Sequence, residues 1–119
     1  MNTKTGTVAE DLLEAMIGVK GYCVDRGVLV GVSIFGHRLK ADLMVSGLPD
    51  FPRGLAIESK WQSSDGSVDE KFPYLVMNIR MAYPCPVIII LDGRGSKPGA
   101  VEWLKGQVDQ EHLLAVLSC

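Results

Sequence analysis

The sequence has no hydrophobic run long enough to cross a membrane and no excess of positive charge. Its longest apolar stretch, residues 87–91, has the length of a strand, whereas a membrane-spanning helix needs about 20 residues. Fourteen acidic against twelve basic residues give a net charge of −2, which excludes a small basic protein that coats phosphates. Residues 1–6 lack the apolar segment of a secretory signal. We therefore expect a cytoplasmic protein with no membrane partner.

Cysteine and proline are also scarce. The three cysteines, Cys23, Cys85 and Cys119, form no C-x-x-C pair, which argues against a zinc site and against a disulfide framework. With six prolines and 47% hydrophobic residues, the 119-residue chain has the composition of a folded protein. No repeat or low-complexity segment divides it. We expect a single domain over residues 1–119.

The first half of the chain predicts one helix followed by three strands. Apolar residues at helical spacing indicate a helix over residues 8–20. A run rich in β-branched residues predicts a strand over residues 28–35, and a two-residue turn at 36–37 leads into a second strand over 38–45. Alternating apolar and polar residues predict a third strand over 55–62.

The second half alternates helices and strands. Residues 67–70 have the form of a capping box that opens a helix, and Pro73 should kink that helix or delay its regular start. Residues 87–91 are apolar at consecutive positions, which is typical of a strand covered on both faces. A short helix over 100–108 and a last strand over 113–117 follow. The order α-β-β-β-α-β-α-β predicts an α/β fold, a mixed β-sheet flanked by helices.

Charged residues on the second and third strands indicate a chemical site. Asp42 lies within the second strand, while Glu58, Lys60 and Gln62 share one face of the third. If these strands pair, the two carboxylates lie close together, where their repulsion costs on the order of 4 kcal/mol at about 4 Å. A cation usually neutralises such a pair, and hard carboxylate oxygens suit Mg²⁺ or Mn²⁺ better than zinc.

A lysine beside such a cation completes the groups needed to hydrolyse a phosphodiester. The metal lowers the pKa of a bound water, and the Lys60 ammonium stabilises the charge that builds on the phosphate. The alternative from the residues alone is that Glu58 and Lys60 are the solvent-exposed face of a half-buried sheet.

The same residues resemble the signature of a known nuclease family. Asp42, followed after residues 43–57 by Glu58-Ser59-Lys60, is similar to the catalytic motif of the PD-(D/E)XK nuclease superfamily, with Ala41 in place of the proline that often precedes the aspartate. Gln62 completes the extended E-x-K-x-Q form. The order of elements matches the restriction-endonuclease-like core of that family. The resemblance covers residues 10–104 and includes small type II restriction endonucleases and Holliday-junction-resolvase-like members.

This resemblance implies a role for each matching residue. Asp42 and Glu58 would ligate Mg²⁺, with the backbone carbonyl of Ser59 as a third ligand. Lys60 would orient or activate the attacking water and hold the scissile phosphate. Gln62 would position the waters of the metal site or the DNA backbone.

Further candidates lie outside the signature. Resolvase-like members carry a glutamate on their first helix that helps to hold the metal; Glu10 matches its place, and Glu14, one turn further, is the alternative. Lys71, Arg94 and Lys97 are candidates for binding nucleic acid, each also compatible with simple solvation.

The function that the resemblance implies is a Mg²⁺-dependent endodeoxyribonuclease that acts on DNA. One site cuts one strand, so cutting both strands requires a homodimer or a larger assembly. The alternatives are a structure-selective nuclease of the Holliday-junction type and a non-catalytic DNA-binding or assembly subunit that retains the fold.

Overall fold

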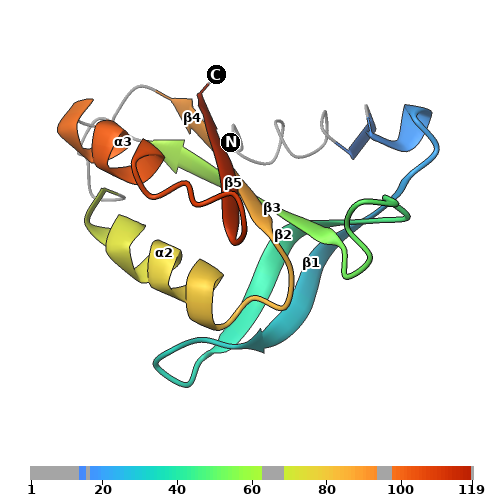
Figure 1. The fold of residues 1–119 in the computed structure, drawn as a ribbon, viewed down its shortest axis with the longest axis horizontal. Coiled ribbons are helices and arrows are strands. Elements are labelled where there is room, and N and C mark those ends of the chain that lie inside the picture. The colour runs from blue at the N-terminus through green and yellow to red at the C-terminus, as the bar shows by residue number, and fades with distance from the viewer. Residues whose placement is uncertain (1–13, 16, 63–68, 94–97, 119) are drawn as a thin grey trace, which may run out of the picture.

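A computed structural model describes residues 14–15, 17–62, 69–93 and 98–118 (Figure 1). In these residues five strands form one sheet, in the order β1-β2-β3-β4-β5. The strands are β1 (Cys23–Val32), β2 (Arg38–Ser46), β3 (Leu55–Gln62), β4 (Val87–Gly93) and β5 (Leu113–Ser118). β1, β2 and β3 pair antiparallel, whereas β4 and β5 run parallel to β3. The predicted mixed sheet is confirmed.

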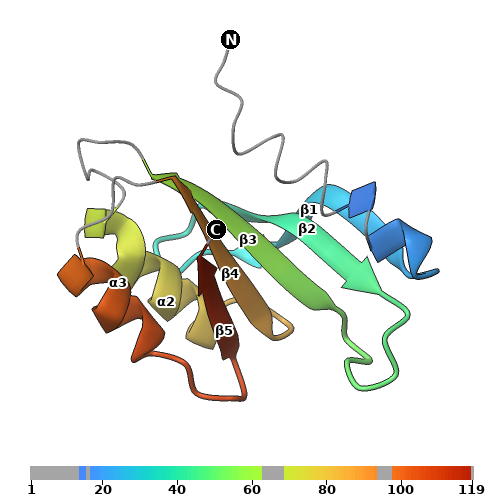
Figure 2. The ribbon, with the colours of Figure 1, turned by 90° about the horizontal axis from the view of Figure 1, so that it is seen from above.

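Two helices pack together against the sheet. A short 3₁₀ turn, η1 (Asp69–Lys71), leads into α2 (Phe72–Met81), and α3 (Pro98–Lys105) follows β4. α2 and α3 lie side by side in both views (Figures 1 and 2). The predicted α/β fold, a mixed sheet with flanking helices, is therefore confirmed.

The larger core cluster fixes α2 over the sheet. Phe72, Val76 and Ile79 of α2 are fully or almost fully buried, because their spacing places them on one face of the helix. They join the buried side chains of the strands in one cluster, which includes Ala56 of β3 and Ile89 of β4. Because Glu58 follows Ala56 by two residues, it points to the same side of β3 as α2.

The second cluster uses the other face of the strands. Leu43 and Ile57, which are register partners on β2 and β3, are buried in it. Ile17 packs against the same cluster from the N-terminal segment, where residues 14–15 and 17–19 are helical. Residues 8–13 and 16 of the helix predicted over residues 8–20 lie outside the described residues, and residue 20 forms a turn.

The predicted strand over residues 28–35 was wrong at both ends. β1 begins at Cys23, because its backbone pairs with β2 as far as Ser46. It ends at Val32, because residues 33–37 form a five-residue loop instead of a two-residue turn. The Ser33 N–H donates to the His37 carbonyl at 2.7 Å, and Gly36 takes a φ of 86° that favours glycine.

The helices differ from their predicted bounds by a few residues. Pro73 lies in the first turn of α2, where its missing N–H costs nothing, so the regular helix starts only after η1. Lys71 is the N-cap and makes no side-chain capping bond, while residues 67–68 of the predicted capping box lie outside the described residues. α3 spans Pro98–Lys105 instead of 100–108. Among the described helices, none is long and apolar enough to cross a membrane.

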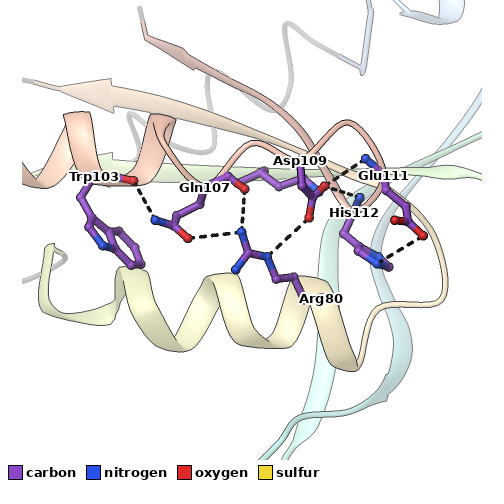
Figure 3. A network of polar contacts seen from close by, with 7 residues as sticks. Arg80, Trp103, Gln107, Asp109, Glu111 and His112 are labelled. Atoms are coloured by element: carbon purple, nitrogen blue, oxygen red, sulfur yellow. Dashed lines mark hydrogen bonds and ion pairs between the residues drawn. The ribbon is translucent and has the colours of Figure 1, made fainter.

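A polar network ties α2 to the segment between α3 and β5 (Figure 3). The Arg80 guanidinium donates to the Gln107 carbonyl at 2.9 Å and lies 3.4 Å from Oδ2 of Asp109. Oδ1 of Asp109 accepts hydrogen bonds from the backbone N–H groups of Glu111, His112 and Leu113. Although desolvation opposes ionisation of Asp109, these three bonds lower its pKa to about 2.

Candidate functional site

The candidate site lies where β2 and β3 separate. Register pairs join these strands only at residues 43–45 and 55–57, and Asp42 and Glu58 are the next residues on each strand. Beyond these pairs, hydrogen bonds from backbone N–H groups to the two carboxylates link the strands. The Asp42 N–H donates to Oε2 of Glu58 at 3.3 Å, and the Ser59 N–H donates to Oδ2 of Asp42 at 2.8 Å. These bonds hold the two carboxylates together at the predicted position.

Tyr83, just beyond the end of α2, also holds Glu58. Its hydroxyl donates a buried hydrogen bond of 2.6 Å to Oε2 of Glu58. Burial and the neighbouring Glu58 charge raise the pKa of Tyr83 well above its usual range, so the hydroxyl remains a donor. Tyr83 could not be predicted as a site residue, because no local pattern links it to a residue 25 positions earlier on β3.

Lys60 forms an ion pair with Glu58. Its ammonium lies 3.8 Å from Oε1 of Glu58, and about a third of its side chain is exposed (34%). Glu58 itself is 2% exposed. The lysine therefore sits at the mouth of the site, with the buried carboxylate beneath it.

Glu58 is harder to ionise than an ordinary glutamate. Burial and the charge of Asp42 raise the pKa of Glu58 to about 7, although the Tyr83 hydrogen bond and Lys60 oppose that shift. Near neutral pH, Glu58 is therefore partly protonated. A divalent cation at this position would favour the ionised form.

The residues present suit a hard divalent metal. The hydrogen bonds engage one oxygen of each carboxylate, Oδ2 of Asp42 and Oε2 of Glu58. Two carboxylates, completed by a carbonyl such as that of Ser59 and by waters, form a donor set of the kind that Mg²⁺ accepts. In the described part of the chain, no group of three His, Cys, Asp or Glu side chains gathers as a metal site.

Three lysines line the same pocket as the buried carboxylate. A pocket of about 240 Å³ between α2 and the strands is lined by Glu58, Lys60 and Lys71, together with Lys40 of β2. The remaining lining residues are Leu39, Phe72, Tyr74, Leu75, Asn78 and Tyr83. Lys71, a predicted nucleic-acid contact, thus lies at the site. Lys40 was not among the candidates, although strand alternation already placed it on the face of Asp42.

The other predicted site residues lie away from Glu58 or outside the described residues. The Glu14 carboxylate pairs with Arg26 of β1 at 3.5 Å. Gln62 ends β3 with its backbone opposite Gly93, and its side chain is not described. Glu10, Arg94 and Lys97 lie outside the described residues.

The geometry defines a class of protein, a nuclease-type α/β domain. Carboxylates on adjacent strands and a lysine two residues beyond one of them lie on a mixed sheet backed by helices. Residues 1–118 match the family model described as the PD-(D/E)XK nuclease superfamily domain, and the chain belongs to this superfamily. The predicted family is therefore confirmed. Membership indicates a phosphodiesterase that acts on nucleic acid in a family that typically depends on metal. Searches of curated proteins and of solved structures return no match.

Proposed function

We propose that this chain is a Mg²⁺-dependent endodeoxyribonuclease that hydrolyses DNA phosphodiester bonds, with Mn²⁺ as a substitute. The observation that carries the proposal is the pair of carboxylates, Asp42 and Glu58, held together by bonds across β2 and β3 with Lys60 beside them. Burial makes ionisation of Glu58 costly, and a bound divalent cation would offset that cost.

Asp42, Glu58 and the carbonyl of Ser59 would hold the metal. Bound there, Mg²⁺ supplies a Lewis acid for the phosphate and lowers the pKa of water. Tyr83 keeps Oε2 of Glu58 in place through its hydrogen bond, so the carboxylate does not rotate when it gives up its proton. Glu10, on the N-terminal segment, is the candidate for a further ligand.

Lys60 acts on the substrate. Its ammonium, at the mouth of the site, neutralises the charge of the scissile phosphate and orients the attacking water. Water adds to phosphorus, the P–O3′ bond breaks, and the 3′ oxygen takes up a proton. The products are a 5′-phosphate and a 3′-hydroxyl. Gln62 positions waters or the DNA backbone at the end of β3.

The lysines that share the pocket, Lys40 and Lys71, hold the neighbouring phosphates. Arg94 and Lys97 are further DNA contacts in this proposal. Residues 1–119 form one catalytic domain with one site, so cutting both strands requires a homodimer or a larger assembly.

Two measurements test the proposal. The protein should nick supercoiled plasmid in Mg²⁺ or Mn²⁺ and not in EDTA, and mapped ends should carry a 5′-phosphate. Calorimetry should detect Mn²⁺ binding to the wild type and a weaker signal with Asp42→Ala. Exposed Asp50 provides the matched control, because Asp50→Ala removes a carboxylate elsewhere. Metal-independent nicking, or equal Mn²⁺ binding by all three proteins, would contradict the proposal.

A further inference from the structure

The loop between β1 and β2 presents an aromatic ring beside the lysine-lined pocket. Phe35, in this loop, is 72% exposed, although it is large and apolar. Its ring stacks on that of Tyr74 with a centroid distance of 5.0 Å and an interplanar angle of 21°. Tyr74 in turn lines the pocket together with Lys40 and Lys71. An open aromatic face therefore adjoins a group of ammonium ions.

Hydrogen bonds anchor the loop that carries Phe35. The Ile34 N–H donates to Oδ1 of Asn78 at 2.8 Å, and Asn78 is 2% exposed within α2. Oγ of Ser33 accepts from the N–H groups of Phe35 at 3.3 Å and His37 at 3.1 Å. Figure 1 shows the loop beneath α2. A ligand that contacts the ring would thus meet a preorganised surface.

The fold gains little from the position of Phe35. A ring that is 72% exposed removes little apolar area from water, so core packing does not account for it. The bonds to Asn78 and Ser33 nonetheless anchor the loop in which the Phe35 ring stacks on Tyr74, a residue of the pocket wall. Ammonium groups for a phosphate backbone together with an aromatic face for bases are the two elements of single-strand recognition.

We infer that Phe35 stacks on an unpaired base of the DNA substrate while the adjacent phosphates lie on Lys40 and Lys71. The inference rests on the proposed function and names its substrate class, DNA with unpaired nucleotides beside the scissile phosphate. In a continuous duplex both faces of each base are covered by its neighbours. Only an unpaired or displaced base can offer a face to Phe35.

The experiment compares a fully paired duplex with the same duplex carrying a short unpaired segment. Cleavage in Mg²⁺ is measured for both, and 2-aminopurine in the unpaired segment reports stacking through its fluorescence when Ca²⁺ replaces Mg²⁺. The wild type should cleave the unpaired substrate faster, by about 5-fold or more, the range of one base–aromatic stack. It should also quench 2-aminopurine.

Variants separate stacking from packing. Phe35→Ala and Phe35→Leu should lose the preference and the quenching, because leucine keeps the apolar bulk without the ring. Phe35→Trp should retain both. Met81→Ala, which removes another exposed apolar side chain at the end of α2, is the matched control and should behave as the wild type. Thermal melting checks that each variant folds, and Phe35→Trp keeps the test decisive if the smaller residues unfold the loop.

The outcomes distinguish this inference from the proposed function. Cleavage of both substrates at equal rates, or an unchanged preference in Phe35→Leu, would overturn the inference and leave the nuclease proposal standing. Loss of the preference in Phe35→Trp would overturn it too. Absence of cleavage on every substrate would overturn the proposed function, and this inference with it.

Discussion

The side chains of Asp42 and Glu58 each accept a hydrogen bond from a backbone N–H of the neighbouring strand. Oδ2 of Asp42 accepts from the Ser59 N–H, and Oε2 of Glu58 accepts from the Asp42 N–H, at the point where β2 and β3 separate. The separation exposes backbone donors that need acceptors. The two carboxylates supply them, and the same arrangement brings two negative charges together within the protein.

Burial of Glu58, together with the nearby charge of Asp42, makes stability depend on pH. Because the folded pKa of Glu58 is about 7, above its ordinary 4.5, the folded protein binds more protons than the unfolded chain between these values. The contribution of Glu58 to the free energy of unfolding is fully present below pH 4.5 and is lost as pH rises through 7. This loss is on the order of 3 kcal/mol. Without divalent cations, Glu58→Gln should therefore be more stable than the wild type at pH 8 and similar at pH 4.5.

Chemical denaturation at the two pH values measures this difference. Exposed Glu102→Gln on α3 is the matched control and should track the wild type at both. Added Mg²⁺ should stabilise the wild type more than Glu58→Gln, because it binds the ionised carboxylate. A wild type that is more stable than Glu58→Gln at pH 8 without metal would contradict the raised pKa of Glu58.

Tyr83 acts through Glu58 and is a positioning residue. Tyr83→Phe removes the 2.6 Å hydrogen bond, which favours the ionised form of Glu58, so the pKa of Glu58 should rise further. Activity should fall roughly tenfold at neutral pH, since a hydrogen bond to a charged group contributes about 1.5–3 kcal/mol. The acid limb of the pH–rate profile should move to higher pH. A lower rate with an unmoved profile would indicate a structural role alone.

The lysines of the pocket should set the salt dependence of DNA binding. If Lys40 and Lys71 each contact one phosphate, Lys40→Ala and Lys71→Ala should each reduce the slope of log K against log salt concentration by roughly 1. Exposed Lys105→Ala, at the end of α3, is the control. Fluorescence anisotropy over a salt series measures the slopes. Equal slopes for all three variants would show that Lys40 and Lys71 do not contact the DNA.

Asp109 should stabilise the junction between α3 and β5 at neutral pH. Its folded pKa of about 2 lies below the ordinary 3.8, so its stabilisation is present above pH 4 and is lost as pH falls through 2. Asp109→Ala should lower the melting temperature at pH 7 and have little effect near pH 2. Exposed Asp50→Ala serves as the control. If Asp109→Ala lowers the melting temperature as much at pH 2 as at pH 7, the charge of Asp109 is not the source of the stabilisation.

Strand alternation was sufficient to predict the pair of carboxylates and the lysine beside them. Glu58 and Lys60 share a face because β3 is regular, and Asp42 joins them because β2 is its neighbour. Alternation also placed Lys40 on that face, although only the pocket shows its relation to the site.

The contacts made by α2 could not be predicted in the same way. Tyr83 reaches Glu58, and Tyr74 reaches Phe35, only because the buried face of α2 packs at one angle over the strands. The loop over residues 33–37 likewise depends on the buried Asn78 amide. Such contacts arise from tertiary packing between distant segments, which local periodicity does not encode.

The rate of plasmid nicking in Mg²⁺ under single-turnover conditions tests the central claim most directly. Asp42→Ala and Lys60→Ala should each slow nicking by at least about 100-fold, the scale of removing one group that stabilises a transition state. Asp50→Ala and Lys105→Ala, with the same changes of charge on exposed positions, should nick at the wild-type rate. Nicking by Asp42→Ala or Lys60→Ala at the wild-type rate would contradict the account.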